Sequence, residues 1–162
     1  MSMSDGGPLQ PGREHEKLLT KVGEWTVQCT YFWGEEPMTV EGSDRVEALG
    51  GFWTLGHFEC DTGAIAIRGL ATTGFDPEKQ RFVGTWQDST NPYHYYFEGR
   101  FDAAGKRLEM VGDNIDPMSG LLVKYRSVET FHDDDNRMLE LYVESPTGDE
   151  IQVLEYEYTR KS

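Results

Sequence analysis

A two-residue alternation of apolar and polar side chains recurs along most of this chain. The first instance puts apolar residues at 25, 27, 29, 31 and 33, with threonine or glutamine at 26, 28 and 30. Successive side chains of a β-strand point to opposite faces, so this period indicates a strand with one buried face. Residues 13–22 differ, because Leu18, Leu19 and Val22 follow a helical spacing and Gly23 is placed to end a helix.

Turn-forming residues divide the alternating part into about ten segments. Gly50-Gly51, Asp61-Thr62-Gly63 and Asp76-Pro77 are three of these junctions. No proline falls in the middle of a predicted strand. Consecutive hairpins without a second helical layer hide their edges by closing on themselves. The sequence therefore predicts an all-β fold, an antiparallel up-and-down lipocalin-like barrel of about ten strands with a short N-terminal helix.

The length of 162 residues predicts one barrel domain, residues 13–162. Residues 1–12 are rich in glycine, proline and serine, and we expect them to form a disordered tail. Neither a secretory h-region nor a run of about 18 apolar residues is present in the sequence. Cys29 and Cys60 are the only cysteines, which suits a reducing compartment. We expect a cytoplasmic protein.

The formal net charge is −14 and the isoelectric point is about 4.6. A surface of this sign repels phosphate groups, so we expect neither nucleic acid nor an anionic membrane as a partner.

The chain also carries longer motifs: EWTVQCTYFW followed by GEEP, RVEALGGFW, GFDPEKQRFVGTWQDS, YFEGRFDAAGKRLEMVGDNIDPMSG and the closing YTRK. Together they resemble the bacterial family known as domain of unknown function 1579. The resemblance covers roughly residues 14–161, and its most specific parts are residues 74–89 and 97–106. It implies a lipocalin-like β-barrel. It implies no reaction and no catalytic residue.

Residues 84–96, GTWQDSTNPYHYY, are dense in aromatic rings. If the larger apolar faces point inward, Trp86, Tyr95 and Phe97 line the barrel, together with Trp25 and Tyr31. Buried indole and phenol groups need hydrogen-bond partners, so such an interior suits a ligand with an apolar body and a few polar groups. The alternative is a packed aromatic core without a ligand.

Three polar residues are further candidates for the interior. His57 shares a face with Trp53 and Leu55, and a histidine inside a cavity could act as a general base or a metal ligand. Arg126 and Glu129 lie on opposite faces of one predicted strand, so only one of them points inward.

Each orientation of this strand has its own consequence. An inward Glu129 would need a cationic partner such as Arg45 or Arg68. An inward Arg126 could hold a ligand carboxylate, by analogy with barrels of the fatty-acid-binding shape.

No motif for catalysis or metal binding is present. The run HDDD, residues 132–135, lacks the alternating oxygen ligands and the glycine of a calcium loop, and we expect a solvated turn. GxSxG, P-loop, GxGxxG and HExxH motifs are all missing from the sequence. We therefore expect no catalytic residue, metal or cofactor.

Three hypotheses about function follow, in order of preference. The first is non-catalytic binding of a small, mostly apolar ligand in the barrel. The second is a structural or interaction domain that forms a homodimer. The third is an enzyme that uses the interior as a reaction chamber, with His57 and Glu129 as acid/base partners.

Overall fold

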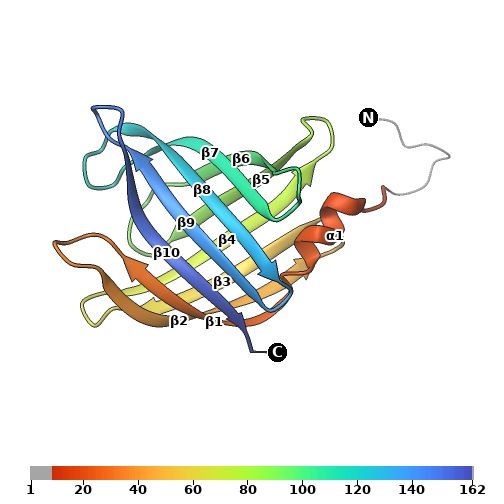
Figure 1. Ribbon diagram of the computed structural model, residues 1–162, viewed down its shortest axis with the longest axis horizontal. Helices are drawn as coiled ribbons and strands as arrows, with labels where there is room; N and C mark the ends of the chain where they lie inside the picture. Colours follow the sequence, from red (N-terminus) through yellow and green to blue (C-terminus); the bar gives the residue numbers. More distant parts are fainter. Residues whose placement is uncertain (1–8, 162) are drawn as a thin grey trace.

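The computed structural model, which describes residues 9–161, is a closed barrel of ten antiparallel strands with one short helix (Figure 1). Each strand pairs with the next one in the chain, and β10 closes the barrel by pairing with β1. The predicted all-β barrel is confirmed, whereas residues 1–8 of the expected tail lie outside the described residues. The elements are α1 (Arg13–Leu19), β1 (Gly23–Tyr31), β2 (Met38–Leu49), β3 (Trp53–Asp61), β4 (Ala66–Asp76), β5 (Arg81–Asp88), β6 (Tyr95–Phe101), β7 (Arg107–Ile115), β8 (Leu122–Asp133), β9 (Asn136–Glu144) and β10 (Glu150–Arg160).

The helix is three residues shorter than the apolar spacing predicts. It ends at Leu19, and Thr20 is its C-cap. The amides of Lys21 and Val22 bond to carbonyls three residues back, each at 3.1 Å, so the chain tightens into turns before β1 starts. Val22 is consequently exposed instead of lying on the buried stripe.

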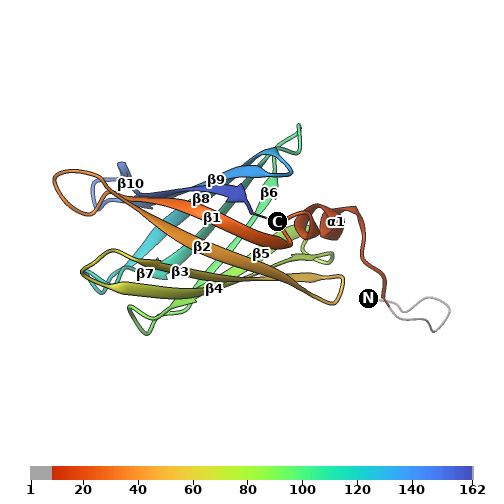
Figure 2. The same ribbon diagram turned by 90° about the horizontal axis from the view of Figure 1, so that it is seen from below.

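The two ends of the barrel are different. Helix α1 lies at one end, and five hairpin loops lie at the opposite end (Figure 2). These loops are residues 32–37, 62–65, 89–94, 116–121 and 145–149. We call these loops, with the strand residue on either side of each, the mouth.

The end covered by α1 is packed with apolar side chains. Leu18 of the helix is 1% exposed and contacts a cluster formed by Phe82, Leu108 and Phe131. Phe75, Phe101 and Met110 pack around this cluster. The helix thus closes one end of the barrel through apolar burial.

A second cluster lines one wall of the barrel. It includes the inward-facing residues of β1 and extends to Phe58 on β3 and Tyr156 on β10. The Phe58 and Tyr156 rings stack with centroids 4.9 Å apart. This wall is therefore built from strands at the two ends of the chain, which closure brings side by side.

Among residues 9–161, no helix has the length and apolar character needed to cross a membrane.

Candidate functional site: the barrel interior

The five aromatic residues expected to line the barrel all face its interior. Trp25 and Tyr31 belong to the packed wall, each with 1% exposure, and Tyr95 is also buried. Trp86 and Phe97 face inward from β5 and β6 but are only half-buried. The structure thus brings these side chains together, and their contact with a ligand stays a prediction.

Trp86 lies directly over a glycine of the neighbouring strand. A Cβ atom at Gly69 would be 2.1 Å from Cη2 of the indole, so any larger residue there would displace the ring. Phe58 packs beside the indole with ring centroids 5.9 Å apart. The indole Nε1 donates to Oδ2 of Asp88 at 2.7 Å, which satisfies its polar edge at the mouth. Trp86 is therefore fixed in place with its ring available to the interior.

Tyrosine hydroxyl groups add polar atoms to this aromatic lining. The Tyr95 and Tyr125 rings have centroids 5.5 Å apart, and burial raises the pKa of both phenols. The Tyr31 hydroxyl lies 2.8 Å from that of Tyr156 and 3.3 Å from Sγ of Cys60. These neutral hydroxyl groups can donate and accept hydrogen bonds within an apolar surface.

Several inward-facing side chains remain partly accessible to solvent. Trp86, Leu139 and Leu154 pack against the buried cluster but are half-buried themselves, as is Phe97. At the α1 end, Leu18, Phe82, Leu108 and Phe131 are buried, and Phe75, Phe101 and Met110 around them are half-buried. Helix α1 covers that end (Figure 2).

The choice between Arg126 and Glu129 is resolved in favour of Glu129. Its carboxylate lies inside the barrel, where Oε2 accepts from Nη1 of Arg137 at 2.6 Å and from Nζ of Lys21 at 3.3 Å. Arg126 points outward and binds Glu109 and Glu150 at 2.7 and 2.6 Å. An inward Arg126 that holds a ligand carboxylate is thereby ruled out.

The expected partners of Glu129 were wrong. Arg45 and Arg68 lie on the outer face, where they pair with Glu47 and Glu59. The real partners are Lys21, which follows α1, and Arg137, at the start of β9. Both approach Glu129 from the α1 end of the barrel, which strand alternation alone does not reveal.

Four buried charges form one network, which we call the internal charge cluster: Lys21, Asp44, Glu129 and Arg137. Burial alone would raise the pKa of Glu129, but the charges of Lys21 and Arg137 hold it below its usual value of 4.5. Burial raises the pKa of Asp44. The charge of Arg137, 3.8 Å away, offsets only part of this rise. Burial lowers the pKa of Lys21. The cluster contains equal numbers of acidic and basic groups.

Aromatic rings enclose the guanidinium group of Arg137. Its Cζ lies 3.7 Å from the ring centroid of Tyr158 and 4.6 Å from that of Trp25. The side chain is 4% exposed, and its Nε has no hydrogen-bond partner in the described structure. Cation–π contact thus replaces part of the hydration that this buried arginine loses.

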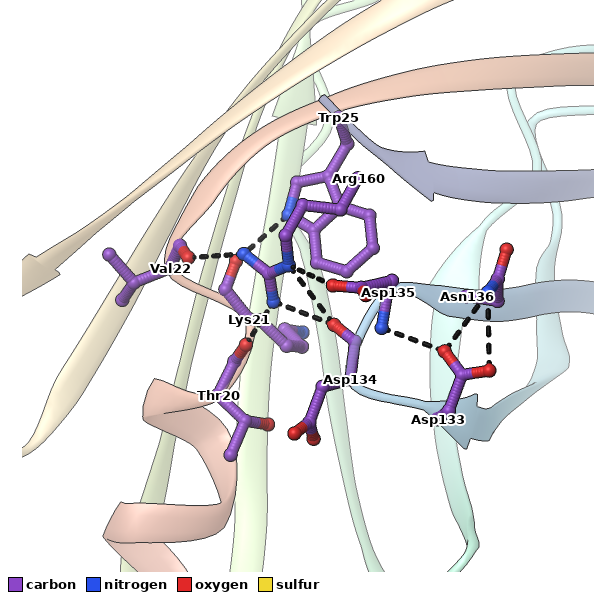
Figure 3. Close-up of polar contacts among 9 residues, drawn as sticks. All are labelled: Thr20, Lys21, Val22, Trp25, Asp133, Asp134, Asp135, Asn136 and Arg160. Carbon is purple, nitrogen blue, oxygen red and sulfur yellow. Dashed lines mark hydrogen bonds and ion pairs between the residues drawn. The ribbon is translucent and has the colours of Figure 1, made fainter. Parts of the chain in front are cut away.

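A second arginine, Arg160, fastens the helix to the barrel (Figure 3). Its guanidinium donates to the carbonyl oxygens of Thr20 and Val22, at 2.6 and 2.7 Å, and to that of Asp134, at 2.8 Å. It also pairs with Asp135 at 3.0 Å. The HDDD run is exposed, as expected, but only Asp134 and Asp135 form the turn, because His132 and Asp133 are the last residues of β8. The backbone of the turn accepts hydrogen bonds from Arg160 of the C-terminal strand.

His57 lies on the outer face of β3. Its Nε2 is 2.9 Å from Oε1 of Glu47, and its side chain is 38% exposed. Phe58 and Cys60 face inward from this strand instead. Trp53 lies outside, where its indole packs over Gly74, and its Cε3 would be 2.4 Å from a Cβ added there. The structure does not bring His57 and Glu129 together, which removes the pairing that the enzyme hypothesis needs.

Two hollows open on the outer surface of the barrel, with volumes of about 510 and 400 Å³. Outward-facing residues of β2 to β5, such as Glu41, Glu59 and Arg68, line them together with backbone of the sheet. Residues 9–161 contain no group of three or more metal-ligating side chains placed to hold an ion. Neither hollow includes Trp86, Tyr95 or Phe97, so the case for an interior site rests on the accessibility of half-buried, inward-facing side chains.

Sequence reasoning missed Lys21, Asp44, Arg137 and Arg160. A signal was present for Arg137, which alternates with Leu139 and Leu141 along β9. The consecutive Met138 and Leu139 obscure that pattern, because they place an apolar residue on each face.

Comparison with known proteins gives one family. Residues 10–160 match the model of a family described as "Protein of unknown function (DUF1579)". No curated protein matches the chain.

Proposed function

The chain belongs to the DUF1579 family, whose description names no function. We propose from its geometry that it binds a small, mostly apolar ligand inside the barrel without catalysis. The observation that carries the proposal is the half-buried state of inward-facing Trp86, Phe97, Leu139 and Leu154. These side chains offer an apolar surface that a ligand would remove from water. In this proposal the protein is a lipocalin-like binding protein of the cytoplasm.

The ends of the barrel give the ligand one entry. Helix α1 and its apolar cluster fill one end, so the ligand enters through the mouth. The hydroxyl groups of Tyr95 and Tyr125 would meet its few polar atoms. Formation of a homodimer through the mouth is the weaker alternative, because apposed acidic loops would repel each other.

The test is a titration with N-phenyl-1-naphthylamine, a neutral probe that fluoresces in apolar surroundings. We expect saturable binding to the folded protein. Phe97→Gln places a polar group on the inner wall and should weaken binding at least about tenfold, given the apolar area of one phenylalanine. Tyr96→Gln is the matched control, because Tyr96 is the next residue on β6 and points outward.

Two results would overturn the proposal. One is the absence of probe uptake by protein whose circular dichroism shows an intact barrel. The other is equal probe affinity for Phe97→Gln and Tyr96→Gln, which would place the probe outside the barrel.

A further inference from the structure

Charge is distributed unequally between the two ends of the barrel. In the described residues the mouth holds no lysine or arginine. It holds eight carboxylates, Glu35, Glu36, Asp61, Asp88, Asp116, Glu144, Asp149 and Glu150, and the last of these is paired with Arg126 on the outer face. Nine of the fifteen lysines and arginines lie instead in α1, in the turns of the opposite end or at the strand residues beside them. The negative potential is therefore concentrated where a ligand would enter.

The mouth is also apolar and aromatic. Exposed hydrophobic side chains lie on or beside four of its loops and at the start of β10; they are Trp33, Ile65, Tyr93, Met118, Leu121, Leu122 and Ile151. The Trp33 ring is 56% exposed and stacks on Tyr31 with centroids 4.1 Å apart. The stack connects the outer rim to the buried aromatic wall, so one continuous ring surface runs from the mouth into the barrel.

Within residues 9–161, the interior offers no unpaired cation to an anionic ligand. Its lysine and arginine, Lys21 and Arg137, already face Glu129 and Asp44 within the internal charge cluster. A ligand carboxylate would have to pass the acidic mouth and would then compete with these internal carboxylates. Both steps are unfavourable.

We propose that the ligand is a hydrophobic cation, an apolar body that carries an ammonium or quaternary ammonium group. The body occupies the aromatic interior, and the cationic group stays at the mouth among the carboxylates and the exposed ring of Trp33. Aromatic faces attract such cations through their quadrupoles, and the acidic loops raise their local concentration. This inference rests on the proposed function and specifies the chemical class of its ligand.

The test compares three ligands with the same decyl chain: decyltrimethylammonium, decanol and decanoate. Each ligand is used below its micelle-forming concentration, and its affinity is measured by displacement of N-phenyl-1-naphthylamine. At about 0.01 M salt we expect the cation to bind about tenfold more tightly than decanol, and decanoate to bind more weakly than either. Raising the salt to about 1 M shortens the screening length from about 30 to about 3 Å and should bring the three affinities together.

A pair of double variants locates the source of the preference. Glu35→Gln with Glu36→Gln removes two exposed charges from the mouth, and Glu16→Gln with Glu78→Gln removes two exposed charges from the α1 end. Coulomb's law in water gives about a twofold change per charge at about 10 Å. The mouth variant should therefore weaken cation binding about fourfold at low salt, with decanol affinity unchanged. The α1-end variant should leave both affinities unchanged.

The outcomes separate this inference from the proposed function. If decanol or decanoate binds as tightly as the cation, the ligand class is wrong and binding in the barrel stands. An equal effect of the two double variants would also overturn the cation inference. If none of the three ligands displaces the probe, or the probe itself does not bind, the proposed function fails as well.

Discussion

Replacing Arg137 by methionine is expected to destabilise the barrel far more than the same replacement of Arg126. Both arginines contact two carboxylates, but Arg137 is 4% exposed and Arg126 is 26% exposed. The pair therefore holds residue type and partner number constant and varies burial. The difference between the two variants isolates the contribution of the internal charge cluster.

The magnitude follows from the distances around Glu129. The guanidinium and carboxylate of Arg137 and Glu129 are in contact at 2.6 Å, and two charges about 4 Å apart interact by about 4 kcal/mol at an effective dielectric constant of about 20. Lys21 remains beside Glu129 in the variant and offsets part of this loss. We expect Arg137→Met to lower the free energy of unfolding by about 3 kcal/mol, within the range for breaking a buried pair. Arg126→Met should cost no more than about 1 kcal/mol.

Thermal unfolding followed by circular dichroism measures both changes. For a chain of this size, about 3 kcal/mol corresponds to a fall in Tm of about 6–12 °C. Urea titration gives the free energies independently. A loss of the same size in Arg137→Met and Arg126→Met would refute the reasoning.

The pH dependence provides a second check on the same pair. Although burial opposes it, the pKa of Glu129 lies below its usual value because Lys21 and Arg137 stabilise the carboxylate. Its contribution to stability is therefore fully present above the unfolded value and is lost as the pH falls through the lower, folded value. The stability difference between the wild type and Arg137→Met should shrink on acidification. If the stability difference between the two proteins stays constant down to the acid transition, the lowered pKa of Glu129 is contradicted.

Two further predictions concern the ends of the chain and the thiols. Arg160→Ala removes the donors to the carbonyls of Thr20 and Val22, so amide hydrogen exchange in α1 should accelerate. Lys161→Ala is the control and should have no such effect. Unchanged exchange in Arg160→Ala would contradict the role of Arg160. Burial raises the pKa of Cys29 to about 12, so at pH 8 almost no thiolate is present, and alkylation in the folded protein should be at least about 10³-fold slower than in denaturant. Rapid labelling of Cys29 in the native state would show that the thiol is accessible and ionised.

The barrel could be predicted because its sequence signal is local and repeated. Alternation and turn residues recur in every hairpin, so an error in one segment does not alter the architecture. The inward positions of Trp86, Tyr95 and Phe97 follow from the same pattern. Closure between β1 and β10 followed from the cost of two open edges.

The polar part of the interior could not be predicted, because it depends on distances between segments. Lys21 and Arg137 approach Glu129 from a turn and from a neighbouring strand, 108 and 8 residues away along the chain. The face of His57 was equally ambiguous. Trp53 and Leu55 favour one orientation, and only the packing of Phe58 against Tyr156 selects the other.

The pairing of β10 with β1 imposes an order on folding during synthesis. Until residues 150–160 leave the ribosome, β1 and β9 each have one edge with unpaired amide and carbonyl groups, and the carbonyls of Thr20 and Val22 lack the guanidinium that binds them. The registers that join the two strands connect residues more than 120 positions apart, such as Tyr31 and Leu154. Contacts of that separation form slowly. Nascent chains of this protein should therefore be most prone to aggregate, and most dependent on chaperones, just before the last strand emerges.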